Sequence, residues 1–264
     1  MKKTSQKKTS TLKPVVYVVG DVHGCAAELT DLLAKITIDA GAVPIEIYMI
    51  GDLIDKGPHP VDVTKMVMSQ FQDMTITSIL GNHEEKYIRW LVRERESKAN
   101  GGENPIQKHY DYTGLEPFWD FFRSLPTHIH LPRFNVLLVH AGIEPRMAML
   151  PPQNIESCRR HEKNLLRTRY VNPRGNMVPL GEENTEAGDR WWADVYDGRF
   201  GTVIYGHQAF PEVAFAKHAI GIDTGCVYGN KLTAIRLDEN GNHKLVQVDA
   251  KQKYCLAYDE EAEG

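Results

Sequence analysis

Five short apolar runs in this chain each end at an aspartate, asparagine or histidine, usually beside a glycine. Their length and composition predict buried strands that stop at a tight polar turn. Side chains placed just beyond the carboxyl ends of such strands lie where open α/β sheets bind their ligands. Convergence of five polar turns on one place predicts a metal site. The runs cover 15–19, 45–50, 76–80, 136–139 and 202–205, and the polar residues that follow are Asp21, His23, Asp52, Asp55, Asn82, His83, His140 and His207.

Helical patterning fills the gaps between the first three runs. Apolar residues recur at helical spacing in 25–36 and 60–71, and a third helix is predicted to follow Asn82, with Glu84 and Glu85 in its first turn. This alternation of strands and helices favours a parallel sheet and an α/β fold. An aromatic helix at 118–125, a hairpin of 127–131 with 134–139, and a second, more antiparallel sheet built from 202–248 are predicted further along.

One catalytic domain is expected over residues 14–250, since 264 residues with 42% hydrophobic side chains suffice for one substantial core. Residues 1–13 carry five lysines and no apolar stretch, which indicates a disordered basic tail rather than a secretory signal. The acidic residues 251–264 are expected to form a solvated tail. Residues 97–113 predict a long surface loop, and 145–192, with few apolar runs, a cap over the site.

The overall charge excludes some partners. A formal net charge of −4 gives no general attraction to DNA or to an anionic membrane. No apolar run approaches the ~20 residues needed to span a bilayer. The four cysteines lack a CxxC spacing, so reduced thiols and a cytoplasmic location are expected, and organelle targeting by the basic tail stays open.

The predicted metal site combines oxygen and nitrogen ligands. Such a set suits Mn²⁺, Fe²⁺ or Zn²⁺, whereas a structural zinc site would contain thiolates. For any one residue a capped turn is the commoner explanation, so the prediction rests on the joint pattern. Six ligands are too many for one ion that must also hold water and substrate, but they suffice for two ions bridged by a carboxylate. Two ions ~3.5–4 Å apart form a clamp for displacement at phosphorus, in which a bridging hydroxide is the nucleophile. The six are Asp21, His23, Asp52, Asn82, His140 and His207.

The motifs around these residues resemble those of the PPP-type, calcineurin-like metallophosphoesterases. They are GDVHG (20–24), GDLIDKG (51–57), GNHE (81–84), HAG (140–142) and GH (206–207). The ending GIDTGCVYGNKLTAIRL (221–237) resembles the diadenosine tetraphosphatase and ApaH-like branch. The resemblance implies a four-layer sandwich of two mixed β-sheets flanked by helices, with a bimetal site at the carboxyl ends of the strands.

The resemblance also assigns metal ligands. The first ion would be held by Asp21, His23 and Asp52, and the second by Asp52, Asn82, His140 and His207, so that Asp52 is the bridge. Manganese is the expected metal, while iron, zinc or cobalt stay open because ligand type alone does not choose among them.

Proton transfer and phosphate binding are assigned in the same way. His83 would protonate the leaving oxygen, and Asp55 would orient its imidazole. The arginine usual in the family after this aspartate is Lys56 here, which offers a point charge instead of a bidentate fork. Arg169 is the expected phosphate clamp, with Arg167 as the alternate.

The expected activity is hydrolysis of phosphoanhydride bonds in dinucleoside polyphosphates such as diadenosine tetraphosphate. The same centre would also support a serine/threonine or dual-specificity phosphoprotein phosphatase, or an mRNA-cap pyrophosphatase of the ApaH-like branch. A non-catalytic scaffold would be expected to lose ligands, and none is missing. An enclosed cap would favour nucleotides and an open groove phosphoproteins. Several aromatic residues could stack on a nucleoside, although a core role is commoner; they are Tyr110, Tyr112, Trp191, Trp192, Tyr196 and Phe210.

Overall fold

Two stacked five-stranded sheets form the centre of the protein, as seen in the computed structural model, which describes residues 13–69, 73–104 and 111–256. The first sheet has the order β13-β12-β1-β2-β3. Its strands β1, β2 and β3 pair in parallel, as the alternating sequence predicted. Strand β12 pairs antiparallel with β1 on one side and with β13 on the other. The strands are β1 (Val15–Val19), β2 (Ile45–Met49), β3 (Met74–Ser78), β12 (Lys231–Arg236) and β13 (Lys244–Asp249).

The second sheet is mixed and has the order β10-β11-β9-β5-β4. Its central pairs are parallel and its two edge pairs antiparallel, including the predicted hairpin of β4 with β5. The prediction that all of 202–248 joins this sheet was wrong, because β12 pairs with β1 in the first sheet. Apolar residues on both faces of β12 mark it as buried without showing which sheet it enters. The strands are β4 (His128–Leu131), β5 (Val136–Val139), β9 (Thr202–Tyr205), β10 (Ala214–Phe215) and β11 (Ala219–Gly221).

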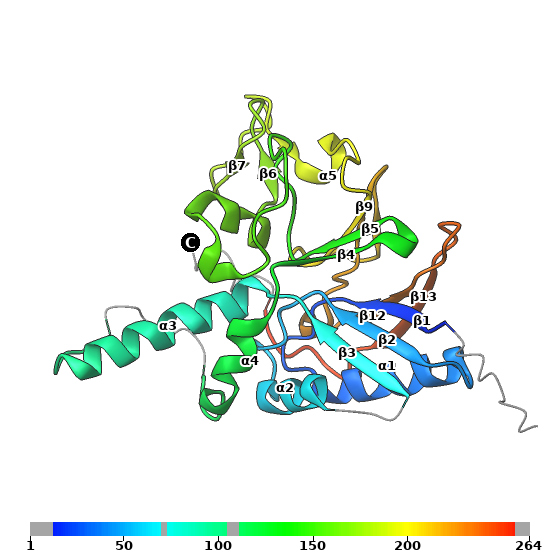
Figure 1. Ribbon diagram of the computed structural model, residues 1–264, viewed down its shortest axis with the longest axis horizontal. Helices are drawn as coiled ribbons and strands as arrows, with labels where there is room; N and C mark the ends of the chain where they lie inside the picture. The colour runs from blue at the N-terminus through cyan, green and yellow to red at the C-terminus, as the bar shows by residue number, and fades with distance from the viewer. Residues whose placement is uncertain (1–12, 70–72, 105–110, 257–264) are drawn as a thin grey trace, which may run out of the picture.

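Helices cover the outer face of the first sheet. Figure 1 shows α1 and α2 beneath the strands, and α3 running outward from the sheet edge. Helix α1 extends past its predicted end to Ala40, where Gly41 follows, and α2 ends earlier than predicted, at Met68. The α-helices are α1 (Ala26–Ala40), α2 (Pro60–Met68), α3 (Asn82–Ala99), α4 (Trp119–Ser124) and α5 (Trp192–Val195), and the 3₁₀ turns are η1 (Glu116–Phe118), η2 (Pro132–Phe134), η3 (Ile155–Ser157), η4 (Arg160–Leu166) and η5 (Cys226–Tyr228).

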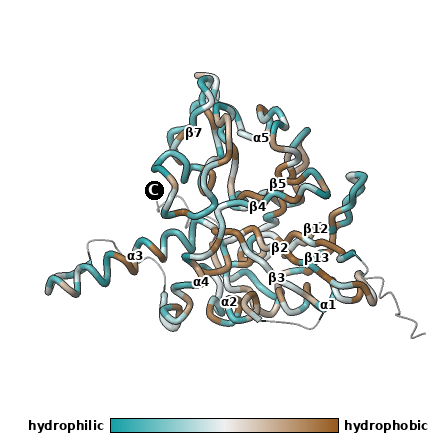
Figure 2. Tube along the Cα trace, in the orientation of Figure 1, coloured by the Kyte–Doolittle hydropathy of each residue, from teal (hydrophilic) through white to brown (hydrophobic). Residues whose placement is uncertain are grey.

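Alternation along β1 builds two core layers at once. Tyr17 and Val19 pack with the residues of α1, whereas Val16 and Val18 pack between the two sheets. Apolar segments accordingly run through the middle of Figure 2. A third cluster covers the outer face of the second sheet and includes Trp192 of α5. Helices, two sheets and this outer layer make the predicted four-layer sandwich.

A small third sheet stands above the second one, with the order β7-β6-β8. It lies within 145–192, the stretch expected to form a cap, and appears at the top of Figure 1. Its strands are β6 (Tyr170–Val171), β7 (Met177–Val178) and β8 (Arg190–Trp191).

Several sequence predictions concern the ends and loops of the chain. The first residues of the predicted loop 97–113 belong to α3, and 105–110 lie outside the described residues. So do most of the basic tail and residues 257–264. Residues 251–256 lie against α1, where the Lys251 backbone N–H donates to Glu28. Within the described part of the chain, no helix has the length and apolar character to cross a membrane.

Candidate metal centre

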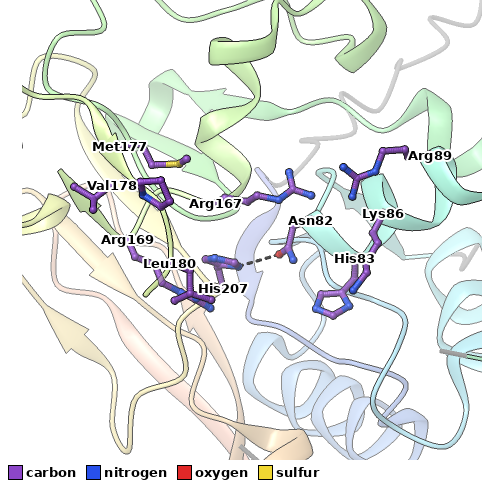
Figure 3. A pocket seen from close by; sticks show the side chains of 11 residues that line it. Asn82, His83, Lys86, Arg89, Arg167, Arg169, Met177, Val178, Leu180 and His207 are labelled. Atoms are coloured by element: carbon purple, nitrogen blue, oxygen red, sulfur yellow. Dashed lines mark hydrogen bonds between the residues drawn. The ribbon is translucent and has the colours of Figure 1, made fainter. Parts of the chain in front are cut away.

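The polar turns after β1, β2, β3, β5 and β9 meet at one edge of the stacked sheets, as the sequence predicted. Asp52 lies in the middle of this meeting point and is 1% exposed. Its carboxylate is 3.3 Å from Nε2 of His140 and 3.5 Å from Nε2 of His23. Asn82 Oδ1 is 2.7 Å from His140 Nε2 and 2.9 Å from His207 Nδ1. Figure 3 shows the contact of Asn82 with His207 from the side of a neighbouring cavity.

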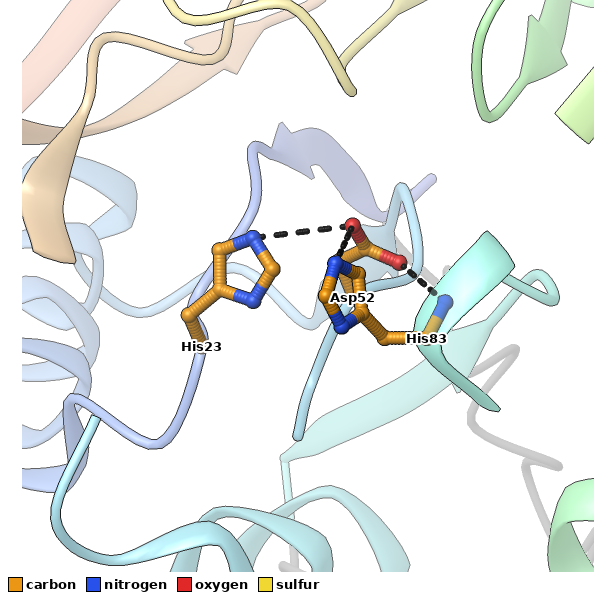
Figure 4. Close-up of side chains that lie close together, drawn as sticks. All are labelled: His23, Asp52 and His83. Atoms are coloured by element: carbon orange, nitrogen blue, oxygen red, sulfur yellow. Dashed lines mark hydrogen bonds and ion pairs between the residues drawn. The ribbon is translucent and has the colours of Figure 1, made fainter. Parts of the chain in front are cut away.

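Asp52 belongs to two groups of possible ligand atoms, each within 4.8 Å. One group adds His140 and His207, and the other adds His23 and His83. Figure 4 shows the second group, with both imidazoles turned toward the carboxylate. A carboxylate shared by two groups has the placement that a bridge between two cations requires.

Two histidines have their tautomers set by the backbone. His140 Nδ1 lies 2.9 Å from the carbonyl of Ile50, and His23 Nδ1 lies 2.9 Å from the carbonyl of Ile54. Because a carbonyl only accepts, each Nδ1 carries the proton, and the lone pair of each neutral ring is on Nε2. In this neutral form both Nε2 atoms lie beside Asp52 with a lone pair that a cation could bind.

The polar atoms of the centre include acceptors that a cation could use. Asn82 Oδ1 faces two imidazole nitrogens, His140 Nε2 and His207 Nδ1, and in the tautomer set by Ile50 the first of these offers a lone pair. Asp21 Oδ1 is buried without a hydrogen-bond partner among the described residues, while its Oδ2 accepts from the His207 backbone N–H. One orphaned carboxylate oxygen, an amide oxygen and imidazole lone pairs form the mixed ligand set that divalent transition metals bind.

The pKa shifts of the carboxylates agree with this reading. Burial, Asp223 and Asp52 raise the pKa of Asp21 well above its usual value, so its charged form needs positive charge nearby. Burial would also raise the pKa of Asp52, but positive charge on His140 and His83 outweighs it and lowers that pKa well below its usual value. Asp52 in turn raises the pKa of His140 against the effect of burial, so the Asp52 carboxylate draws positive charge to itself, which a bound cation would supply instead.

His83 and Asp55 are in contact, as the sequence predicted for this pair. His83 Nδ1 is 2.8 Å from Asp55 Oδ2, and both residues are buried. The carboxylate fixes the Nδ1 proton and points Nε2 toward Asp52, 3.8 Å away. Burial chiefly lowers the pKa of His83, and Lys56 and His23 lower it further against the opposing effect of Asp52.

The turns that carry these residues are held in unfavourable backbone conformations. Five non-glycine residues of the centre have φ between 46° and 68°, a region that L-residues seldom adopt. Such strain persists only where the surroundings over-determine it and is concentrated at functional sites. Glycine is required beside them, since a Cβ at Gly206 would lie 1.9 Å from Asp21 Oδ1. The five are His23, Asp52, Asp55, Lys56 and His207.

Glu84 organises the loop around Asp52, a role that the sequence did not reveal. Its carboxylate is fully buried and accepts from the backbone N–H groups of Asp52, Leu53 and Ile54, at 2.8–3.2 Å. It also accepts from the Gly81 N–H at the start of α3. Burial and Asp52 raise the pKa of Glu84 to about 7. The third position of a helix is where an acidic side chain returns to the helix start, which is the signal that could have identified it.

Lys56 lies beside His23 in the centre. Its Nζ donates to the hydroxyl of Tyr228 at 2.8 Å and is 3.5 Å from His23 Nε2. Tyr228 belongs to η5, which follows Asp223, and neither residue was assigned to the site from the sequence. The predicted phosphate-binding lysine thus reaches the centre, held by a tyrosine from the carboxyl-terminal part of the chain.

Arg167 and Arg169, the two predicted phosphate ligands, both line a cavity of about 300 Å³ beside Asn82, His83 and His207 (Figure 3). Arg167 donates to Glu85 at 2.7 Å. Arg169 lies near His207, whose pKa is lowered first by burial and then by Arg169. The structure brings both arginines to the centre without choosing between them.

The candidate stacking aromatics lie mostly in the core. Tyr112, Trp192 and Tyr196 are at most 5% exposed. Trp191 packs against Phe210 with ring centroids 5.7 Å apart, and Tyr110 lies outside the described residues. None of the described ones lines the cavity beside the metal centre.

Comparisons with known proteins agree with this geometry. Residues 14–248 match the family described as "Calcineurin-like phosphoesterase". The chain is 30% identical to an asymmetrical bis(5'-nucleosyl)-tetraphosphatase PrpE of Oceanobacillus iheyensis, over 90% of this chain and 94% of that protein. It is 29% identical to the protein of that name in Bacillus subtilis, over 84% and 90%. A crystal structure described as "a putative diadenosine tetraphosphatase" superposes with a TM-score of 0.65 at 26% identity, over 92% of this chain and 95% of that one.

Proposed function

The chain belongs to the calcineurin-like phosphoesterase family and is a hydrolase. We propose that it cleaves phosphoanhydride bonds of dinucleoside polyphosphates such as diadenosine tetraphosphate. The observation that carries the proposal is likeness along nearly the whole chain to relatives named as tetraphosphatases. The cationic cavity beside the candidate centre supports it, because a polyphosphate needs several positive groups beyond the reacting phosphorus.

The family implies two divalent metal ions, and we propose that six residues hold them. Asp21, His23 and Asp52 are assigned to one ion, and Asp52, Asn82, His140 and His207 to the other. When bound, the ions supply positive charge that activates a water for attack and offsets the charge of the phosphate. Manganese is the proposed metal.

His83 is the proposed proton donor to the leaving oxygen. Donation from Nε2 requires a ring that is protonated on both nitrogens, with the Nδ1 proton held by Asp55. Burial lowers the pKa of His83 in the protein alone, so the protonated ring depends on negative charge brought by the substrate phosphates. Asp55 then has two roles: it orients the His83 ring, and it stabilises the positive charge of the protonated ring.

Phosphate binding is assigned to cations on both sides of the centre. Arg169 and Arg167 approach from the cavity, and Lys56 approaches from the side of Tyr228. The Arg167 guanidinium is held against Glu85, which leaves its remaining donors for a phosphate. Residues 145–192, which carry both arginines, are the proposed cap.

A substrate panel tests the proposal. Mn²⁺-dependent turnover is measured in parallel on diadenosine tetraphosphate, a cap dinucleotide and a phosphoserine peptide, with chromatographic separation of products. Preference for diadenosine tetraphosphate is expected, with ATP and AMP as products of asymmetrical attack or two ADP of symmetrical attack. Preference for the peptide would overturn the proposal in favour of a phosphoprotein phosphatase, and preference for the cap dinucleotide in favour of a cap pyrophosphatase.

A further inference from the structure

The cavity beside the candidate metal centre has two unlike walls. One wall is the first half of α3, from which Asn82, His83, Lys86 and Arg89 line the cavity. The opposite wall is the stretch 177–180, which begins with β7 and is apolar. Figure 3 shows the cationic side chains of α3 on one side and Met177, Val178 and Leu180 on the other. A site with a charged and an apolar wall fits a ligand that has both characters.

The cations of α3 form a continuation of the metal centre. Asn82, Lys86 and Arg89 are spaced i, i+4 and i+7, so they lie on one face of the helix. With a rise of ~1.5 Å per residue, Arg89 stands ~10 Å along the axis from Asn82. A chain of phosphates that starts at the metal centre can therefore follow this face outward.

Arg167 is fixed beside the same face. Its Nη2 donates to Glu85 Oε2 at 2.7 Å, which ties the guanidinium to α3. Burial alone would raise the pKa of Glu85, but Arg167 and Arg89 outweigh it and lower that pKa. Among the described residues that line the cavity there is no carboxylate, so its lining is cationic and apolar.

The apolar wall is anchored to the rest of the fold by strand pairing and a buried side chain. Strand β7 pairs with β6, and the Met177 backbone N–H donates to Glu144 Oε1 at 2.7 Å. Glu144 is 2% exposed and follows His140 by four residues, so the wall is anchored to the turn that carries a candidate ligand. Leu180 is 44% exposed although it is large and apolar. An apolar face of this kind suits the flat face of a nucleobase.

We propose that this cavity is the subsite for the nucleotide portion beyond the scissile bond, in which Lys86 and Arg89 bind distal phosphates and Leu180 packs against the nucleoside. The inference rests on the proposed function and extends it to substrate selection. Arg169 and Arg167 hold the phosphates nearest the centre, and the α3 pair discriminates a long polyphosphate from a simple phosphomonoester.

The phosphate end of the subsite is tested by the double variant Lys86→Ala/Arg89→Ala. The readout is kcat/KM for diadenosine tetraphosphate divided by kcat/KM for p-nitrophenyl phosphate. This ratio is expected to fall roughly 10- to 100-fold, because two charge-assisted contacts are lost on the longer substrate. Arg93→Ala is the matched control, since Arg93 lies on the same helix, pairs with Glu96 and does not line the cavity. An unchanged ratio in the double variant would overturn the inference.

The nucleoside end is tested by Leu180→Ser. Inhibition of p-nitrophenyl phosphate turnover is measured with a methylene-bridged diadenosine tetraphosphate and with inorganic tripolyphosphate. The inhibition constant of the dinucleotide is expected to rise about 5- to 10-fold while that of tripolyphosphate stays constant. Met149→Ser is the control, because Met149 is also a large, exposed apolar residue and lies outside the cavity. Equal changes for both inhibitors, or none for either, would contradict a nucleoside contact.

The two proposals fail in different ways. If the wild-type protein cleaves p-nitrophenyl phosphate but not diadenosine tetraphosphate, the proposed function fails. Binding at the subsite can then still be measured with the methylene-bridged diadenosine tetraphosphate, which inhibits without being cleaved. Its inhibition constant is expected to rise in Lys86→Ala/Arg89→Ala. If the wild-type protein cleaves the dinucleotide and the ratio survives the double substitution, only the subsite fails.

Discussion

Two aspartates near β1 have opposite surroundings. Asp39, at the end of α1, accepts from the Tyr17 hydroxyl at 2.6 Å and from Arg236 at 3.1 Å, and it pairs with Lys244. Asp21, just after β1, has one oxygen without a partner among the described residues and lies near two other carboxylates. The same strand therefore supports a charge that the protein satisfies itself and a charge that it leaves for a ligand.

The pKa values express this difference. Burial would raise the pKa of Asp39, but Lys244, Tyr17 and Arg236 outweigh it and lower the pKa to about 2. The pKa of Asp21 is raised, first by burial. A lowered acid pKa stabilises the fold at neutral pH, whereas a raised one destabilises it. The ion pairs of Asp39 thus stabilise the folded protein, whereas the buried charge of Asp21 destabilises it as long as no cation is bound.

The largest predicted loss of activity comes from replacing Asp52, the carboxylate shared by both groups of ligand atoms. Asp52→Asn is expected to reduce turnover of diadenosine tetraphosphate by more than ~10⁴-fold, because removing the shared charge disrupts both cation sites. Initial rates at saturating Mn²⁺ provide the measurement, and circular dichroism checks that the variant is folded. A folded variant that kept a tenth of the activity would rule out the bridging role.

His83→Asn comes next. Turnover is expected to fall ~10²–10⁴-fold with metal content unchanged, because the variant removes a proton donor and no assigned ligand. The loss should be smaller for p-nitrophenyl phosphate, whose leaving group needs little protonation. Equal losses on both substrates would instead indicate that His83 serves the centre itself, in keeping with its 3.8 Å distance from Asp52.

Removing each aspartate charge should shift the stability of the metal-free protein in opposite directions. Asp21→Asn is expected to stabilise the chelator-treated protein by about 1–3 kcal/mol, because a buried charge without a counterion is removed. Asp39→Asn is expected to destabilise it by about 1–2 kcal/mol through loss of its ion pairs. Urea unfolding measures both free energies.

Controls are available for both substitutions. Asp31→Asn removes the acid of a half-exposed pair with Lys251 and should cost less than ~0.5 kcal/mol. Asp39→Asn should leave turnover unchanged, since Asp39 lies outside the centre. If Asp21→Asn destabilised the protein as much as Asp39→Asn does, the two aspartates would not differ in their effect on stability and the comparison would be wrong.

The last effect concerns the pH dependence of stability. The folded-state pKa of Asp39, about 2, lies below its unfolded value, ~3.9, so its contribution is present above pH 4 and is lost as pH falls toward 2. The wild-type protein should therefore lose about 1–2 kcal/mol more stability than Asp39→Asn between pH 5 and pH 2. Parallel urea titrations across this range measure the difference, and coincident curves would exclude the ion pairs as its source.

The sequence predicted the centre better than its surroundings. Each candidate ligand follows a strand-like run and a tight turn, which is a local signal, and parallel strands then bring the turns together. The sheet that β12 joins is decided by packing between distant segments, so its apolar pattern could not reveal it. The roles of Lys86 and Arg89 depend on where α3 lies relative to β7, and no spacing within the helix expresses that, whereas the position of Glu84 in the first turn of α3 was a usable signal.

The number of Mn²⁺ ions bound per chain most directly tests the proposed two-ion centre. Apo protein prepared with a chelator is titrated with Mn²⁺, and bound metal is counted after dialysis while electron paramagnetic resonance reports whether the ions are coupled. Two coupled ions per wild-type chain are expected, and at most one in Asp52→Asn. A single ion in the wild-type protein, or two tightly bound ions retained in Asp52→Asn, would contradict the assignment of Asp52 as the bridge.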